Sequence, residues 1–210
     1  MLVACFDTVA LRPELRAPAT QHDAVGLADA LERMVDEGRA TPDDREAAYE
    51  AICSWTDTSV EYAFARASLA GRLAQVRGVT AVGLVREMEH WGREALRLDP
   101  RWRDGAPKRL LGTMYVLVPG KLVRHGTSEE GLELLEAQTR DFPGDPVNHL
   151  RLAEAYVTLD DVEPATEHLC FALARSKSLK ASDASLLASL VEQAGGRTSL
   201  DCGRSGELAH

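Results

Sequence analysis

The chain has few aromatic residues, few cysteines and no long apolar run. Aromatic side chains make up 5% of its 210 residues, which argues against a β-sandwich core. The four cysteines, Cys5, Cys53, Cys170 and Cys202, are scattered, and none forms a C-x-x-C pair with metal-ligand spacing. We therefore expect no disulfide framework, and we expect Cys53 and Cys170 to be small apolar core residues. No stretch approaches the roughly 18 apolar residues of a membrane-spanning helix, so we expect no membrane span.

Motifs for catalysis are missing as well. The sequence has neither a P-loop nor a G-x-G-x-x-G motif, and no grouping of serine, cysteine and histidine suggests a nucleophile with its base. Glu87 and His90 have the spacing of half of a di-iron carboxylate site. The only other match, Glu207 and His210, lies in the C-terminal tail, so we interpret Glu87 and His90 as a structural salt-bridging pair. We expect no enzymatic activity, no metal and no cofactor.

Helical periodicity is what the sequence does contain. Abundant alanine and leucine, with apolar residues at three- and four-residue steps, predict an all-α fold. We expect a first hairpin from residues 22–38, capped by Asp23, and residues 41–55, capped by Thr41 with Pro42 in the first turn. Residues 1–21 contain two prolines and no amphipathic face, and we expect them to be a loose leader.

Three further hairpins follow in the helical domain, which we assign to residues 22–194. The expected helices span residues 58–76 and 82–98, then 109–118 and 128–141, then 148–159 and 163–174. The last pair has the small-large pattern of a tetratricopeptide-type hairpin. A single helix over residues 182–194, capped by Ser182 and stopped by two glycines, then closes the apolar face of the last repeat. We expect residues 195–210 to be a disordered tail.

Several motifs in this order resemble one family. They are Tyr62-Ala63-Phe64-Ala65-Arg66-Ala67, the segment Trp91 to Pro100, Ala106 to Gly112 with Tyr115, the Val118-Pro119-Gly120 linker, and Leu152-Ala153-Glu154-Ala155-Tyr156. Together they make about half of the chain similar to the T-component family of tripartite ATP-independent periplasmic transporters. The resemblance implies a helical solenoid without catalytic activity, located in the periplasm as a lipoprotein, often oligomeric, with an apolar groove or pore and a substrate-binding protein as its partner.

The charge is unevenly distributed. Residues 61–126 carry 12 basic and 6 acidic side chains, a net charge of +6 between ends of −7 and −8. Within this region Arg86, His90, Arg93, Arg97 and Arg101 recur at three- and four-residue steps and share one helix face. Such a row is either a solvated face or a clamp for an acidic partner. With an overall charge of −9 and a pI near 5.2, we expect no nucleic-acid binding.

The linker of residues 116–123 is apolar and interrupted by Pro119-Gly120, so it cannot continue the preceding helix. It could cover the solenoid's own concave face, contact a second subunit, or line a pocket. The candidate binding residues, for a protein partner or an apolar small molecule, are therefore Arg86, His90, Trp91, Arg93, Arg97, Trp102, Met114, Tyr115, Leu117 and Leu122.

Three functional hypotheses follow from these residues. The first is a non-enzymatic helical-repeat scaffold that binds a protein or an apolar ligand in its concave groove. The second is a transport-associated periplasmic lipoprotein, because Leu2-Val3-Ala4-Cys5 spells a lipoprotein cleavage box with Cys5 as the lipidated residue. Only Met1 precedes that box, so the sequence as written predicts a cytoplasmic chain unless the true start lies upstream. The third is a cytoplasmic regulator that binds an acidic partner through the arginine row.

Overall fold

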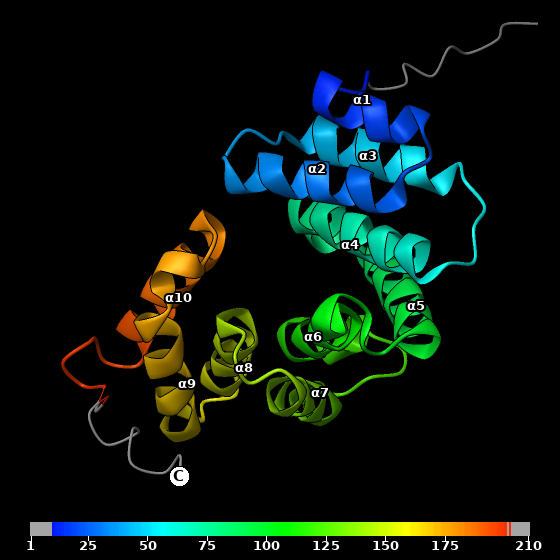
Figure 1. Ribbon diagram of the computed structural model, residues 1–210. Helices are drawn as coiled ribbons and strands as arrows, with labels where there is room; N and C mark the ends of the chain where they lie inside the picture. The colour runs from blue at the N-terminus through cyan, green and yellow to red at the C-terminus, as the bar shows by residue number, and fades with distance from the viewer. Residues whose placement is uncertain (1–9, 201, 203–210) are drawn as a thin grey trace, which may run out of the picture. The chain divides into compact units, whose positions relative to one another are not determined.

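The computed structural model describes residues 10–200 and Cys202, and this part of the chain is helical throughout. It contains ten α-helices and three short 3-10 segments, with no strand among the described residues (Figure 1). The all-α prediction is confirmed. The chain divides into two compact units, Met1–Asp99 and Pro100–His210, and each has its own buried core.

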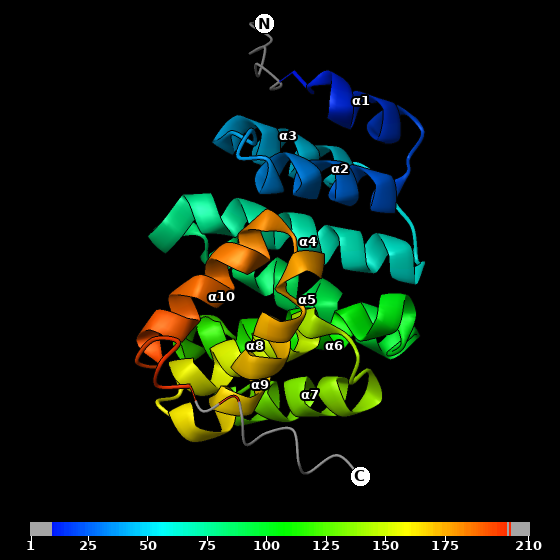
Figure 2. The same cartoon turned by 60° about the vertical axis from the view of Figure 1, so that its left-hand side comes forward.

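The first unit is built around one central helix, α4 (Val60–Arg77). Its elements are α1 (Pro13–Thr20), α2 (Ala24–Asp36), α3 (Pro42–Cys53), α4 (Val60–Arg77), η1 (Gly78–Thr80) and α5 (Val82–Leu98). Helices α4 and α5 form the most extensive contact, and both α2 and α3 pack on α4 (Figure 2). The core between these helices is built from leucine, methionine and alanine side chains, with Tyr62 as its largest member.

The second unit repeats the hairpin arrangement. Its elements are α6 (Trp102–Leu117), η2 (Gly120–Leu122), α7 (Ser128–Asp141), α8 (Pro146–Thr158), α9 (Val162–Ala174), η3 (Ser176–Ser178) and α10 (Ala181–Gln193). Helix α6 pairs with α7 and α8 with α9, while α8 also contacts α6 and α10. The hairpin predicted at residues 148–174 is therefore present as α8 and α9.

Close approach within the second unit depends on two glycines. A Cβ atom on Gly112 would lie 2.9 Å from the Gly131 carbonyl oxygen, and a Cβ on Gly131 would lie 2.9 Å from that of Gly112. Helices α6 and α7 therefore cross backbone to backbone at this point, which only glycine permits. The neighbouring Leu135 is 1% exposed and fills the space beside the crossing.

The predicted helix caps of the first hairpin are confirmed. The Asp23 carboxylate accepts a hydrogen bond from the Gly26 amide at 2.8 Å. At the next helix the Asp44 amide donates to Thr41 Oγ1 at 3.2 Å, and the Thr41 amide donates to Asp44 Oδ2 at 2.9 Å. This reciprocal capping box satisfies amides that a helix otherwise leaves without partners, and it explains why α3 begins at Pro42.

The expected loose leader is wrong for residues 13–20, which form α1. Pro13 occupies the first turn, where its missing amide costs nothing, and Leu15 is fully buried in the core of the first unit. One buried leucine anchors a helix that has no regular apolar face. Residues 1–9, including Cys5, lie outside the described residues.

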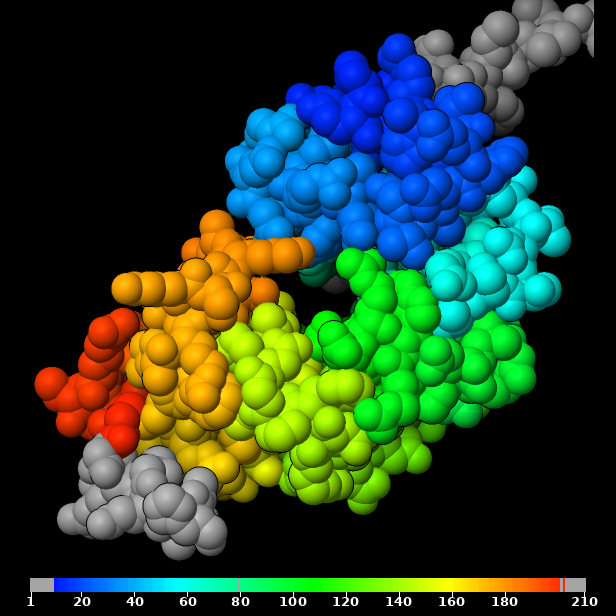
Figure 3. All heavy atoms as spheres, in the orientation of Figure 1, coloured from blue at the N-terminus to red at the C-terminus, as the bar shows by residue number. Residues whose placement is uncertain are grey.

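The C-terminal predictions also need correction. Helix α10 begins at Ala181 after Lys180, so Ser182 lies inside the helix instead of capping it. The segment after α10 is not disordered as far as it is described, because Leu200 is only 7% exposed and packs on α8, α9 and α10. The turn that redirects the chain uses Gly195 and Gly196, both with positive φ. Figure 3 shows this segment, in red, lying against α9.

Within the described residues, no helix combines the length and apolar character needed to cross a bilayer.

Candidate functional site

The basic residues predicted on one face of α5 are all exposed. Arg86, His90, Arg93 and Arg97 lie on the solvent side of the helix, while Val85, Gly92 and Ala95 are buried on its other side. Arg97 donates from Nη2 to Glu94 Oε1 at 2.6 Å, and this bond lowers the pKa of the Glu94 carboxyl. Arg101 lies beyond the end of α5, in the second unit.

Trp91 supports α5 from the inside and does not offer a free aromatic surface. Its indole Nε1 donates to Glu87 Oε2 at 3.1 Å, and the same oxygen accepts from Arg66 Nε at 3.2 Å and Nη2 at 3.0 Å. The Arg66 guanidinium lies over the Trp91 ring at 4.7 Å, and the Tyr62 ring meets its edge. Glu87 is thus a structural ion-pair partner, as the sequence suggested, but its partner is Arg66 and not His90.

The candidate residues of the second unit divide between core and surface. Met114 and Tyr115 are 2% and 5% exposed, and a Cβ atom on Gly126 would lie 2.2 Å from the Tyr115 ring. The linker after α6 therefore folds back onto α6 and covers Tyr115. These two residues belong to the core, whereas Leu117 is 41% exposed and Leu122 and Trp102 are half-buried.

Helix α6 starts earlier than predicted, with an unusual turn. Arg103, Asp104 and Gly105 all have positive φ, at 45°, 55° and 75°. Such backbone is costly for residues with a Cβ atom. It is held by Gln138, which is fully buried and donates from Nε2 to the Asp104 carbonyl oxygen. A turn at this position could have been predicted from the Asp104-Gly105 pair, because both residue types favour turns.

A row of polar side chains ties the first helices of the hairpins in the second unit. Arg109 on α6 donates to Asn148 Oδ1 on α8 at 2.7 Å, and Arg151 on α8 donates to Asp183 on α10 at 2.6 Å. Burial lowers the pKa of Arg109. Asp145 pairs with Arg109 at 3.3 Å, as Asp183 does with Arg151, so each guanidinium is neutralised within the chain and the row holds the helices together. Sequence analysis missed it because its members lie more than 30 residues apart.

A pair of histidines joins α8 to α9. His149 Nε2 lies 2.9 Å from the Pro143 carbonyl oxygen, and His149 Nδ1 lies 3.0 Å from His168 Nδ1. Because a carbonyl only accepts, the neutral His149 carries its proton on Nε2, and His168 must donate from Nδ1. The Phe171 ring stacks on His149 at 3.7 Å. Burial lowers the pKa of both imidazoles, and the neighbouring His149 lowers that of His168 further.

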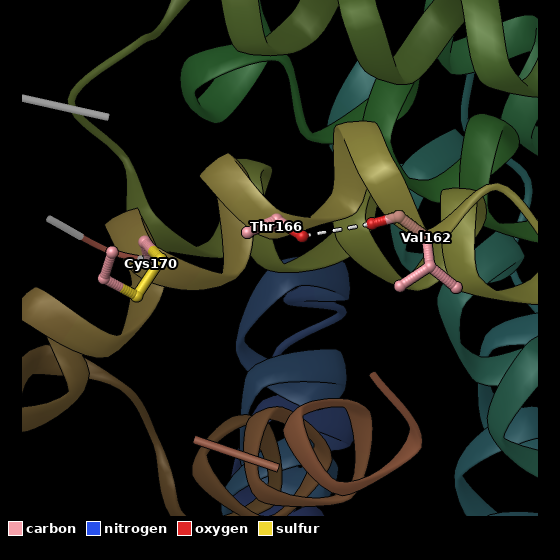
Figure 4. The surroundings of a disulfide bond; sticks show 4 residues. Val162, Thr166 and Cys170 are labelled. Carbon is pink, nitrogen blue, oxygen red and sulfur yellow. Dashed lines mark hydrogen bonds between the residues drawn. A yellow bond between two sulfur atoms is a disulfide. The ribbon is translucent and has the colours of Figure 1, made fainter. Parts of the chain in front are cut away.

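Cys170 and Cys202 form a disulfide, which corrects the expectation that Cys170 is a free core residue. The bond ties the segment after α10 to α9. Figure 4 shows it on the same face of α9 as Thr166, whose hydroxyl donates to the Val162 carbonyl oxygen at 3.2 Å. Cys53 is free and half-buried, as expected of a core-side cysteine; burial raises the pKa of its thiol, which makes it less reactive.

A cleft of about 280 Å³ lies between α9 and α10. Its wall is mainly apolar, with Leu173 from α9 and Leu187 and Val191 from α10, and Glu192 and Arg197 add one charge of each sign. None of the predicted binding residues lines it.

The described residues contain no group of three or more histidine, cysteine, aspartate or glutamate side chains that could hold a metal ion. Compared with known proteins, the chain matches no family model and no curated sequence.

Proposed function

We propose that this protein is a non-enzymatic helical-repeat scaffold that binds an acidic protein partner through the exposed face of α5. The observation that carries the proposal is the position of Arg86, His90, Arg93 and Arg97, which all face solvent on one helix. The opposite face of the same helix is buried, and α5 packs against α4. An arginine guanidinium can form two parallel hydrogen bonds with one carboxylate. Clustered charge also accelerates association with a partner of opposite sign.

Charge reversal on α5 tests this function. The variant Arg86→Glu/Arg93→Glu/Arg97→Glu should weaken capture of the partner by at least about tenfold at low salt. Because the three side chains are exposed, its thermal unfolding should stay close to that of the wild type. The control is Arg16→Glu/Arg33→Glu/Arg140→Glu, which reverses three exposed arginines away from α5. Equal capture by both variants would refute a role for the α5 face.

A second candidate function is a transport-associated lipoprotein of the periplasm. The Cys170–Cys202 disulfide favours it, because structural disulfides persist in oxidising compartments and are rare in the cytosol. The similarity to the T-component family supports the same function. The periplasmic location of this second candidate differs from the cytoplasmic location expected from the sequence as written.

Thiol trapping distinguishes the two locations. Cells are quenched with acid, free thiols are alkylated, and the protein is analysed by mass spectrometry. Export predicts that Cys170 and Cys202 escape alkylation while Cys53 is modified after denaturation. Full alkylation of all three would place the chain in a reducing compartment. Reading the gene upstream of Met1 for a basic and apolar extension tests the lipoprotein prediction separately.

A further inference from the structure

One half-buried arginine of the first unit lacks the partner that the others have. The half-buried arginines of the described chain are Arg12, Arg45, Arg66, Arg72, Arg109 and Arg151. Five of them form a salt bridge with a carboxylate, to Asp44, Glu87, Glu32, Asp145 and Asp183 respectively. Among the described residues no carboxylate oxygen lies within 4.0 Å of the Arg45 guanidinium. A half-buried charge without a counter-ion is unusual because its desolvation is not offset.

The contacts of Arg45 leave one edge of its guanidinium without a hydrogen-bond acceptor. Nη1 donates to the Arg72 carbonyl oxygen at 3.0 Å and to Gln75 Oε1 at 3.2 Å, which are both neutral acceptors. Nε is buried without any hydrogen-bond partner. Nη2 makes no hydrogen bond with the described residues and is not among the buried unpartnered atoms, so it reaches solvent.

The neighbouring Arg72 shows what this edge normally binds. Its Nε donates to Glu32 Oε2 at 2.8 Å and its Nη2 donates to Glu32 Oε1. These two nitrogens form the side of the guanidinium that matches the two oxygens of a carboxylate. In Arg45 the same two nitrogens have no acceptor.

The charges around Arg45 favour an added anion. Arg72 and Gln75 face it from α4 and Glu32 faces it from α2, where Glu32 is already occupied by Arg72. Glu46, the next residue on α3, is paired with Arg77. Burial and the charge of Arg72 lower the pKa of Arg45, yet arginine stays protonated in proteins. These side chains together carry three positive and two negative charges.

We propose that the Nε–Nη2 edge of Arg45 binds an oxyanionic group, a carboxylate or a phosphate, at the surface formed by α3 and α4. The anion first contacts the accessible Nη2, and it reaches the buried Nε after a rearrangement of the atoms around that nitrogen. Bidentate binding then gives Arg45 the partner that the other five arginines already have. This site is separate from the α5 face and does not depend on the proposed scaffold function.

The direct test is NMR of the arginine Nε–H signals in the full chain. Inorganic phosphate and succinate are titrated separately at constant ionic strength set with sodium chloride. The Arg45 signal should shift and saturate with at least one of the two, and the responding anion identifies the phosphate or the carboxylate source. A wild-type protein whose Arg45 signal fails to saturate with either anion would overturn the proposal without any variant.

Two variants distinguish bidentate hydrogen bonding by Arg45 from simple attraction of the anion to a positive charge. Arg45→Lys keeps the positive charge but loses the second donor, so binding of the responding anion, followed by calorimetry, should weaken by about tenfold. Arg16→Lys makes the same exchange at an exposed position on α1, outside the α5 face, and should leave binding within about twofold. Equal losses in the two variants, or no loss in Arg45→Lys, would contradict a site at Arg45.

Discussion

The imidazole rings of His149 and His168 meet between α8 and α9, and their hydrogen bond requires that at least one ring be neutral. With His149 donating to the Pro143 carbonyl, its Nδ1 must keep a lone pair for His168. Glu167, Glu136 and Asp145 draw protons towards the pair, while Arg175 opposes protonation. Burial outweighs the acidic neighbours, so the pKa values of both histidines lie below 6.5.

The buried histidine pair predicts that the folded state becomes less stable in acid. The unfolded chain binds protons at these histidines more readily than the folded chain, so stability is fully present above about pH 6.5 and falls as the pH drops towards the folded-state pKa values. The limiting slope is about 1.4 kcal/mol per pH unit for each proton. Urea denaturation between pH 7.5 and 5 should show a shallower pH dependence in His168→Asn. His90→Asn, at an exposed site, should retain the wild-type dependence, and a similar change in both would contradict the interpretation.

Gly105 is the residue on which the left-handed turn of α6 depends most. Its φ is 75°, and a Cβ atom there would lie 2.0 Å from the buried Gln138 Oε1. Gly105→Ala should lower the free energy of unfolding by about 2 to 3 kcal/mol, from backbone strain and displacement of Gln138. Gly83→Ala is the control, because Gly83 has ordinary φ and open space for a Cβ. Urea melts in which both variants behave alike would show that the turn is not strained.

At the scale of elements, the segment after α10 is held by one covalent bond and one buried side chain. The disulfide reaches back 32 residues to α9, and Leu200 packs between α8, α9 and α10. The glycines at 195 and 196 allow the reversal of direction that brings Cys202 to Cys170. The closing helix is therefore itself secured by the segment that follows it.

Loss of the disulfide should lower the free energy of unfolding of the second unit. Cys202→Ser should reduce the free energy of unfolding by about 2 to 4 kcal/mol, since the closed loop no longer restricts the unfolded chain. Adding a reductant to the wild type should reproduce the loss, while Cys202→Ser should no longer respond to it. Cys53→Ala serves as the matched control and should keep its response to reductant. If denaturant melts of the wild type are insensitive to reductant, the disulfide does not contribute.

At the scale of the whole molecule, the two units have separate buried clusters. Residues from Leu15 to Leu69 form the cluster of the first unit, and residues from Leu150 to Leu200 form the largest cluster of the second. Separate cores are what allow parts of a chain to fold alone.

The second unit should therefore fold without the first. A fragment of residues 100–210, expressed under oxidising conditions, should show helical circular dichroism and a cooperative thermal transition. The full chain should then unfold in more than one step when the disulfide is reduced, because only the second unit contains it. A fragment with no cooperative transition would show that the units depend on each other for stability.

Most helices could be predicted because their signals are local. Asp23 and Thr41 cap helices through contacts three residues away, and Pro42 starts α3 through its own fixed φ. The glycines and prolines that end hairpins act on the backbone next to them. The prediction failed where a single distant contact decided the structure. Leu15 makes a helix of a proline-containing segment, and Leu200 with Cys202 orders a tail that has no pattern of its own.

The sequence by itself determined the all-α class, the hairpin order and the exposed basic face of α5, because helix periodicity places residues on faces before any packing occurs. Only the tertiary structure decided that Trp91 and Tyr115 are packed side chains, that His149 meets His168, and that Arg45 lacks a counter-ion. Contacts between residues on different helices depend on how the helices stack, and no local pattern in the chain records that stacking.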